Sequence, residues 1–187
     1  MAIGSTRYVG AYSMISPVMA QVYAMCGVAF SGKSTLARRI ADELSIALIS
    51  LDAINHERGL RGGEGMSIGQ WEETSAIAMD RLRRRLKEGE SVVVDDTFSR
   101  RFLRDRCKAV ALEFDAGFTI VFVDTPIDEI RARRDANYQR PTRHHVRDDI
   151  FEDHYRTFQF PSANEPVVRV TDRFDLESWL SEQAARL

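Results

Sequence analysis

The sequence predicts an α/β fold, a three-layer sandwich in which helices cover both faces of a five-stranded, mainly parallel sheet that carries a helical lid. Two observations lead to this prediction. Short apolar runs alternate with helical patterns along the 187 residues, and no internal repeat or low-complexity linker breaks the alternation. Right-handed crossovers between successive strands make such a sheet parallel. The length suits one domain, which we expect over residues 21–187 after a flexible N-terminal extension over residues 1–20.

The elements follow from the spacing of apolar residues, which recur every third or fourth position in helices and cluster in short runs in buried strands. The expected strands are 22–26, 47–51, 91–95, 118–124 and 166–170. The expected helices are 34–44, 67–87, 103–114, one opened by Pro126, one that starts near Asp148, and 176–187. Ser67 and Gln70 resemble a capping box at the start of the expected helix 67–87. The glycine-rich stretch Arg58–Gly69 before it is expected to be a mobile loop.

Composition excludes several classes of protein. With 44% hydrophobic and 29% charged residues, the chain is not intrinsically disordered. A formal charge of −2 and a pI of about 6.1 give no overall basic field for nucleic acid or a membrane surface. No apolar run approaches the ~20 residues that span a bilayer. Cys26 and Cys107 lack metal-ligand spacing and are expected to be reduced, buried thiols, which favours a cytoplasmic location.

A phosphate-binding loop is the most specific motif in the chain. Gly27-Val28-Ala29-Phe30-Ser31-Gly32-Lys33-Ser34 matches the pattern G-x-x-x-x-G-K-[ST] in full, between an expected strand and an expected helix. In this setting backbone N–H groups converge on phosphate oxygens, and the helix adds its positive N-terminal end. The loop predicts the fold of P-loop NTPases, with ATP and Mg²⁺ as cofactors. The expected nucleotide-binding residues are Gly27, Ser31, Gly32, Lys33, Ser34 and Thr35.

Lys33 is expected to reach the β- and γ-phosphates, and the Ser34 hydroxyl is expected to ligate magnesium. The alternative is a Gly-Ser turn before a helix, with Lys33 merely solvated. The strand-to-helix context favours the nucleotide site.

Carboxylates at the ends of two strands are candidate catalytic groups. Asp52 follows the second expected strand, on the same sheet edge as the phosphate loop. There it can accept a proton from an attacking hydroxyl or anchor a substrate; the alternative is a helix N-cap. Asp95 and Asp96 end the third strand. Strand alternation allows only one of them to face the nucleotide, and we expect Asp96 to be the metal-site carboxylate; the alternative is a capping role.

An arginine-rich segment is expected to form a lid over about residues 131–147. It contains Arg131, Arg133, Arg134, Arg140, Arg143 and Arg147, with His144 and His145 among them. Cationic side chains that close over a triphosphate stabilise the charge of the transferring group, and the planar fork of arginine suits phosphate. The alternative is a solvated basic helix face balanced by neighbouring acidic residues.

Together the phosphate loop, Asp52, the Asp96-Thr97 pair and the lid over Arg131–Arg140 resemble the P-loop kinases of the polynucleotide-kinase type. The arrangement is also similar to chloramphenicol phosphotransferase and zeta-toxin kinases, over about residues 21–187. The resemblance implies that Lys33 and Ser34 bind ATP and magnesium, that Asp52 is the base that activates a substrate hydroxyl, and that Arg131 and Arg134 are lid arginines near the phosphates.

Two departures concern the substrate. Polynucleotide kinases often carry an arginine shortly after the base aspartate, where this chain has Ala53-Ile54-Asn55-His56-Glu57-Arg58. Phe98 follows Asp96-Thr97 where the group often has asparagine. Both departures favour a small hydroxyl compound over nucleic acid as phosphate acceptor.

The expected function is therefore ATP-dependent transfer of the γ-phosphate to a hydroxyl of a small molecule, by a monomer or homodimer with no membrane partner. One alternative is a 5′-hydroxyl polynucleotide kinase, which needs a basic groove leading to Asp52. The other is a nucleotide-binding regulatory or toxin-like ATPase module, which needs no substrate pocket over Asp52.

Overall fold

The sheet of the computed structural model is parallel throughout, with strand order β2-β3-β1-β4-β5. The structure describes residues 19–60, 65–141 and 146–187. The strands are β1 (Gln21–Cys26), β2 (Ala47–Ser50), β3 (Val92–Asp95), β4 (Gly117–Val123) and β5 (Val167–Val170). The predicted α/β sandwich with a five-stranded sheet is confirmed.

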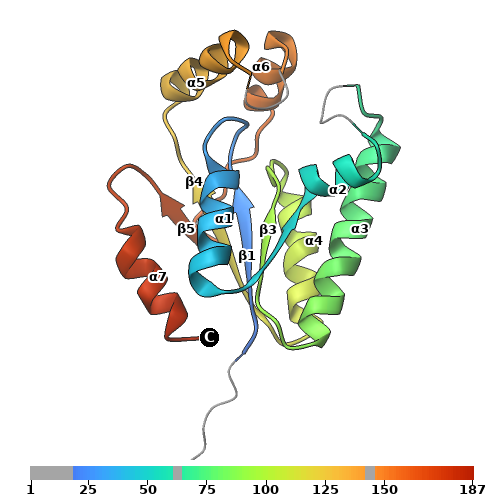
Figure 1. Ribbon diagram of the computed structural model, residues 1–187, viewed down its shortest axis with the longest axis vertical. Helices are drawn as coiled ribbons and strands as arrows, with labels where there is room; N and C mark the ends of the chain where they lie inside the picture. The colour runs from blue at the N-terminus through green and yellow to red at the C-terminus, as the bar shows by residue number, and fades with distance from the viewer. Residues whose placement is uncertain (1–18, 61–64, 142–145) are drawn as a thin grey trace, which may run out of the picture.

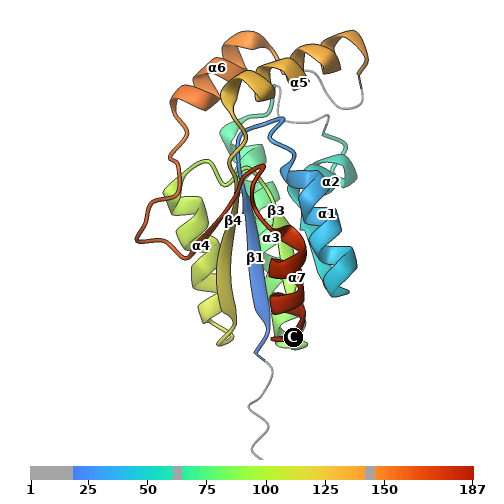
Figure 2. The same cartoon turned by 90° about the vertical axis from the view of Figure 1, so that its left-hand side faces the viewer.

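Helices cover both faces of this sheet, as Figures 1 and 2 show. They are α1 (Lys33–Leu44), α2 (Leu51–Glu57), α3 (Ile68–Lys87), α4 (Arg101–Leu112), α5 (Ile127–Gln139), α6 (Asp148–Arg156) and α7 (Leu176–Ala184). The helices α1 and α7 lie on one face, and α3 and α4 lie on the other. The helices α5 and α6 stand above the carboxyl ends of the strands.

Alternation along β1 divides the core into two layers. Val22 and Ala24 belong to the cluster that contains the buried side chains of α3 and α4. Tyr23 and Met25 belong to the cluster that contains those of α1 and α7. Both sets are fully buried. Because successive side chains point to opposite faces, a strand apolar at every position must be covered on both sides.

The register brings the ends of three strands to one edge. Asp95 pairs with Met25 of β1 on one side and with Ser50 of β2 on the other. The phosphate loop follows β1 directly, and Asp52 follows β2 by two positions. The candidate residues therefore share the edge beneath α5 and α6, where parallel α/β sheets bind ligands.

Helix α2 was not predicted from the sequence. The second strand ends at Ser50 rather than Leu51, and the Ser50 hydroxyl accepts a hydrogen bond from the backbone N–H of Ala53 at 3.3 Å. The predicted capping box at Ser67 and Gln70 is present at the start of α3. Within the described ranges, no helix combines the length and apolar character that a membrane crossing needs.

Some predictions fall on residues that the structure does not describe. They are residues 1–18 of the expected extension, Gly62 and Gly63 of the glycine-rich loop, and Arg143, His144 and His145 of the expected lid.

Candidate active site

The phosphate loop has the backbone geometry that its glycines allow. Gly32 has a φ of 97°, in the left-handed region that glycine adopts without the steric penalty that other residues pay. Phe30, with a φ of 68°, adopts a left-handed conformation without that freedom. A Cβ at Gly27 would lie 2.7 Å from the Ser31 Oγ and 3.1 Å from the Val123 carbonyl oxygen. Glycine is therefore required at position 27 for the chain to turn so tightly after β1.

Contacts from two neighbouring segments hold this loop in place. The Gly27 N–H donates to the Thr97 carbonyl oxygen at 3.1 Å, which ties the loop to the segment after β3. The Thr125 hydroxyl donates to the Ser31 carbonyl oxygen at 2.8 Å. The buried Ser31 hydroxyl has no hydrogen-bond partner among the described residues. The loop is thus preformed, with a polar atom buried inside it.

Lys33 is the centre of positive charge at this edge. It is the first residue of α1, and its side chain is buried with the residue only 6% exposed. Its ammonium group acts to lower the pKa of Asp95, Asp96 and His154. Lys33 therefore lies within electrostatic reach of two carboxylates at the end of β3 and of helix α6.

Asp95, the last residue of β3, and Asp96, which follows it, have different surroundings. Burial raises the pKa of the Asp95 carboxyl, while Lys33 and contact with the Ser34 hydroxyl act to lower it. One Asp95 oxygen is buried without a hydrogen-bond partner among the described residues. Burial also raises the pKa of Asp96, whose carboxylate instead accepts from the backbone N–H groups of Thr97 and Phe98. Asp95 is thus the neighbour of Ser34, while the expected metal role of Asp96 stays a prediction.

The oxygen atoms of Ser34 and Asp95 are a donor set that suits a small, hard cation. Mg²⁺ binds oxygen ligands and is usually held by one or two protein groups together with substrate phosphates and water. Within the described part of the chain, no group of three or more His, Cys, Asp or Glu side chains could hold a metal alone. The unpartnered Asp95 oxygen therefore fits an ion shared with a nucleotide.

Asp52 lies in the first turn of α2, exposed at the same edge. Its charge contributes to the raised pKa of Asp95, so the two carboxylates are near neighbours. Arg58, at the end of α2, contacts α3 and does not take part in this group of carboxylates. The Arg58 guanidinium donates to the Gln70 carbonyl oxygen at 2.7 Å and pairs with Glu73. Arg58 thus joins α2 to α3.

The arginines of α5 that were expected in the lid divide into two groups. Arg133 reaches the phosphate loop, where its Nη1 donates to the carbonyl oxygens of Ser31 at 2.9 Å and Phe30 at 3.3 Å. Arg131 instead pairs with Glu152 of α6 at 3.1 Å. Arg134 lies over the Phe151 ring, 4.7 Å from its centroid. Arg131 and Arg134 therefore join α5 to α6, while Arg133 joins α5 to the loop.

Arg133 was predicted only as one member of the arginine-rich segment, and its contact with the phosphate loop was not predicted, although helical spacing offered a signal. At about 100° per residue, Arg131 and Arg134 share one face of α5, and Arg133 lies on nearly the opposite face. The contact of Thr125 with the phosphate loop was also not predicted. Thr125 precedes Pro126 and belongs to no motif that the sequence shows.

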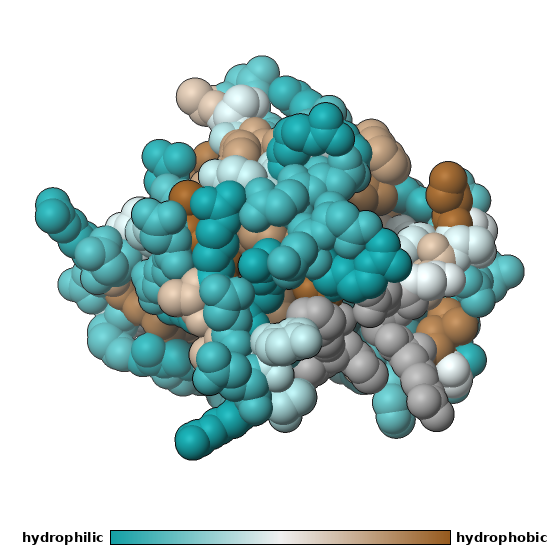
Figure 3. Space-filling model, turned by 90° about the horizontal axis from the view of Figure 1, so that it is seen from above, coloured by the Kyte–Doolittle hydropathy of each residue, from teal (hydrophilic) through white to brown (hydrophobic). Residues whose placement is uncertain are grey.

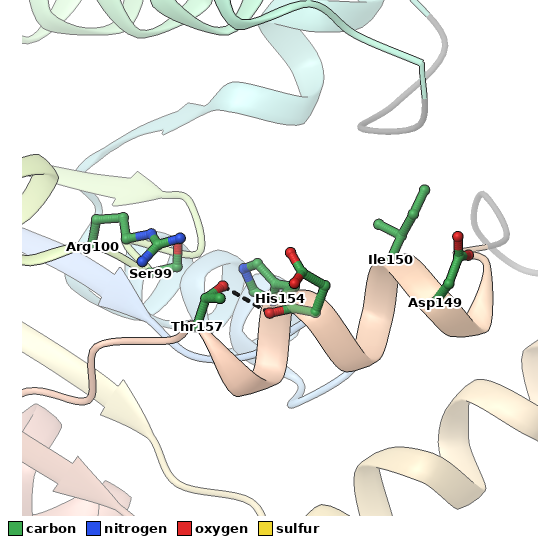
Figure 4. Close-up of a pocket in the computed structure, with 7 residues that line it drawn as sticks. Ser99, Arg100, Asp149, Ile150, His154 and Thr157 are labelled. Atoms are coloured by element: carbon green, nitrogen blue, oxygen red, sulfur yellow. Dashed lines mark hydrogen bonds between the residues drawn. The ribbon is translucent and has the colours of Figure 1, made fainter.

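A hollow of about 510 Å³ lies between the loop after β3 and the helix α6. Figure 4 shows Ser99 and Arg100 of that loop facing His154 and Thr157 at the end of α6, with Asp149 and Ile150 farther along the helix. Burial lowers the pKa of His154 to about 4, helped by Lys33 and Arg100. Seen from above, the face around α5 and α6 is largely hydrophilic (Figure 3).

Comparisons with known proteins agree with this geometry. The AAA_33 family, described as an AAA domain, matches residues 22–161. No curated protein sequence matches the chain.

Three similar solved structures have related folds. The first is the Mycobacterium tuberculosis APS kinase CysC in complex with AMPPNP and APS, with a TM-score of 0.65 and 19% identity over 90% of this chain and 97% of that one. The second is a gluconokinase from Sinorhizobium meliloti 1021, with a TM-score of 0.64 and 21% identity over 90% and 91%. The third is Chaetomium thermophilum Kti12 in complex with ADP-AlF3, with a TM-score of 0.70 and 17% identity over 87% and 94%. The chain has the fold of P-loop kinases.

Proposed function

We propose that this chain, which belongs to the AAA_33 family of AAA domains, is a kinase that transfers the γ-phosphate of ATP to a hydroxyl of a small molecule. The observation that carries the proposal is the grouping of the phosphate loop with two carboxylates, Asp95 and Asp52, at one sheet edge. A nucleotide-binding module without transferase activity needs no exposed carboxylate there. We also propose that, among P-loop kinases, the chain is related to polynucleotide kinases, chloramphenicol phosphotransferase and zeta-toxin kinases.

The nucleotide phosphates bind in the loop, against the backbone N–H groups and side chains of Gly27, Ser31, Gly32, Lys33, Ser34 and Thr35. The N-terminal end of α1 adds positive charge there. Lys33 neutralises charge on the β- and γ-phosphates. Ser34 and Asp95 would hold Mg²⁺, which would neutralise charge on the phosphate oxygens. Asp96 keeps its carboxylate on the Thr97 and Phe98 amides and shapes the loop next to the metal site.

The transfer step uses Asp52. The oxygen of the acceptor hydroxyl forms a bond to the γ-phosphorus, and the bond from that phosphorus to the β–γ bridging oxygen breaks, so that ADP leaves. The hydroxyl proton passes to the Asp52 carboxylate, which acts as general base. Asp52 is exposed at the first turn of α2, where an incoming hydroxyl can reach it.

The lid consists of α5 and α6. Arg133 already contacts the phosphate loop through the Ser31 and Phe30 carbonyl oxygens. Arg131 and Arg134, which connect α5 to α6 in this structure, are proposed to move toward the phosphates when the lid closes over ATP. Lid closure of this kind excludes water from the transfer.

A 5′-hydroxyl polynucleotide kinase is the second candidate, because one similar structure is that of the Pnkp1/Rnl/Hen1 complex, at 18% identity over 84% of this chain and 48% of that one. Two observations favour a small molecule over an oligonucleotide as phosphate acceptor. Arg58, the cation nearest after Asp52 along the chain, is engaged with α3. The basic run on α3 is paired with acidic residues at Arg81, Arg83, Arg84 and Arg85.

We further propose a cytoplasmic location and a monomeric or homodimeric state. Cys26 and Cys107 are buried free thiols, and burial raises the pKa of Cys26 to about 12. Thiols of this kind stay reduced and inert, as is usual in a reducing compartment.

The test is a screen that follows ADP release from ATP with sugars, nucleosides, antibiotics and oligonucleotides with a free 5′ end. A small hydroxyl compound should release ADP stoichiometrically with its own phosphorylation. Lys33→Ala should weaken ATP binding at least about tenfold, while the exposed Lys87→Ala serves as control. ATP hydrolysis without a phosphorylated acceptor would instead favour the regulatory ATPase module, and phosphorylation of oligonucleotides alone would favour the second candidate.

A further inference from the structure

The hollow between the loop after β3 and α6, called the Arg100 pocket below, lies beside the phosphate loop. One wall carries Ser99 and Arg100, and the other carries side chains of α6. The first wall continues directly from Asp95 and is tied to the phosphate loop through the Gly27–Thr97 hydrogen bond. Lys33 influences the pKa of His154 in the second wall. A molecule in this pocket would therefore lie within reach of the phosphate-binding residues.

The two carboxylates that line the pocket, Asp149 and Asp153, each have an arginine partner outside the lining. Asp149 pairs with Arg147, and Asp153 pairs with Arg156 at 2.6 Å. His154 is uncharged at neutral pH, since its pKa is about 4. Arg100 makes no ion pair or side-chain hydrogen bond with any residue that the structure describes. Arg100 is thus the cationic side chain of this lining that is open to an anionic ligand.

The wall that carries Arg100 is held rigidly. The Ser99 carbonyl oxygen accepts from the Gln159 N–H at 2.8 Å, and the Arg101 N–H donates to the Gln159 Oε1 at 2.8 Å. The backbone on both sides of Arg100 is therefore fixed against the segment that follows α6. A fixed backbone lowers the entropy that a binding site loses when it captures a ligand.

The remaining groups suit the rest of a small polar molecule. The Ser99 hydroxyl can donate and accept hydrogen bonds, and the neutral imidazole of His154 can do the same. Ile150, 36% exposed, offers an apolar contact for carbon atoms. A guanidinium binds carboxylate and phosphate through two parallel hydrogen bonds.

We infer that the Arg100 pocket is the acceptor site of the kinase, and that Arg100 binds an anionic group, a carboxylate or a phosphate monoester, on a small hydroxyl compound. This inference rests on the proposed function, and it narrows the acceptor from any small alcohol to an anionic one. The bound anion fixes one end of the acceptor, so that a hydroxyl at its other end is presented toward Asp52 and the γ-phosphate. Arg100 is a specificity-determining residue in this arrangement.

The experiment compares matched acceptors that differ only in the anionic group. ADP release at saturating ATP is measured with glycerol, glycerate and glycerol 3-phosphate, and with glucose, gluconate and glucose 6-phosphate. The two anionic classes in each set separate carboxylate from phosphate recognition. Arg100→Gln is compared with Arg106→Gln, which removes an exposed arginine of α4 that does not line the pocket.

An anionic member should be used with a kcat/KM about 10- to 100-fold above that of its neutral partner, as expected for a charge-assisted hydrogen bond. Arg100→Gln should remove this preference mainly by raising KM for the anionic member, whereas Arg106→Gln should retain it. Equal use of neutral and anionic members, or a preference that survives Arg100→Gln, would overturn the inference while leaving the kinase proposal in place.

If none of these compounds releases ADP, calorimetry with AMPPNP-loaded protein gives a separate readout. Binding of glycerol 3-phosphate or gluconate that is lost in Arg100→Gln would support the pocket independently of turnover. Absence of binding by all four anionic probes would overturn the inference.

Discussion

Arg104 and Glu165 form a two-point ion pair in the interior, with Nε–Oε2 and Nη2–Oε1 distances of 3.0 Å. Their side chains are 2% and 4% exposed. The same guanidinium donates to the Phe98 carbonyl oxygen at 2.9 Å and to the Gln159 carbonyl oxygen at 2.8 Å. Burial alone would raise the pKa of Glu165, but hydrogen bonds from Arg104 and the Ser162 N–H lower it. The pair thus joins α4 to both segments that support the Arg100 pocket.

Arg104→Met should destabilise the protein by about 3–5 kcal/mol, because it leaves the Glu165 carboxylate buried without its partner. Urea unfolding measures this loss of stability. Glu165→Gln should also lower the free energy of unfolding, because it leaves the Arg104 guanidinium buried without its charged partner. Arg83→Gln is the matched control, since its pair with Glu113 is solvent-exposed and such pairs contribute little. Equal free energies of unfolding for Arg104→Met and Arg83→Gln would contradict the structural role assigned to the buried pair.

Asp52→Asn should leave ATP binding unchanged and lower kcat by about 10²–10⁴-fold, because the asparagine amide cannot take up the proton of the substrate hydroxyl. Binding of AMPPNP by calorimetry and steady-state ADP release with the best acceptor measure the two effects. Asp42→Asn, an exposed change on α1, is the control. Full phosphoryl transfer by Asp52→Asn would remove Asp52 from the role of base.

The metal site gives a prediction that separates two adjacent aspartates. Asp95→Asn should raise the Mg²⁺ concentration needed for AMPPNP binding about tenfold or more, because it removes a charged oxygen beside Ser34. Asp96→Asn should leave this Mg²⁺ dependence nearly unchanged, since its carboxylate is engaged with the Thr97 and Phe98 amides. The reverse order of the two variants would return the metal role to Asp96.

The sheet could be predicted from the sequence because its strands are apolar at nearly every position, a pattern that depends only on local composition. Helix α2 could not, because a seven-residue segment is too short for helical periodicity to stand out. The choice between Asp95 and Asp96 depends on the register of β3 against β1, where Asp95 lies opposite Met25. That register is a property of the assembled sheet.

The candidate site divides in the same way. The phosphate loop is contiguous, so its motif could be recognised directly in the sequence. Arg100 and His154, by contrast, lie on separate elements that meet only when α6 folds over the loop after β3. The pairing of Arg131 with Glu152 likewise depends on how α5 packs against α6, which no local pattern encodes.

His154 should make stability depend on pH in a defined window. Burial, Lys33 and Arg100 lower its pKa to about 4, against an opposing effect of Asp153, whereas the unfolded chain has a value near the ordinary ~6.5. Between these values the unfolded chain binds a proton that the native protein does not. Stability should therefore be complete above about pH 6.5 and fall as the pH drops toward 4, by up to about 1.4 kcal/mol per pH unit.

His154→Gln isolates this contribution from carboxyls that titrate nearby, such as Asp95 and Asp96, whose raised pKa values act in the opposite direction. The variant also loses the edge-to-face contact with Phe158, which should lower stability equally at every pH. The difference in unfolding free energy between parent and variant, measured in urea from pH 7.5 to 4.5, should therefore be constant above pH 6.5 and shrink below it. A difference that stays constant over the whole range would show that His154 is not held neutral in the folded pocket.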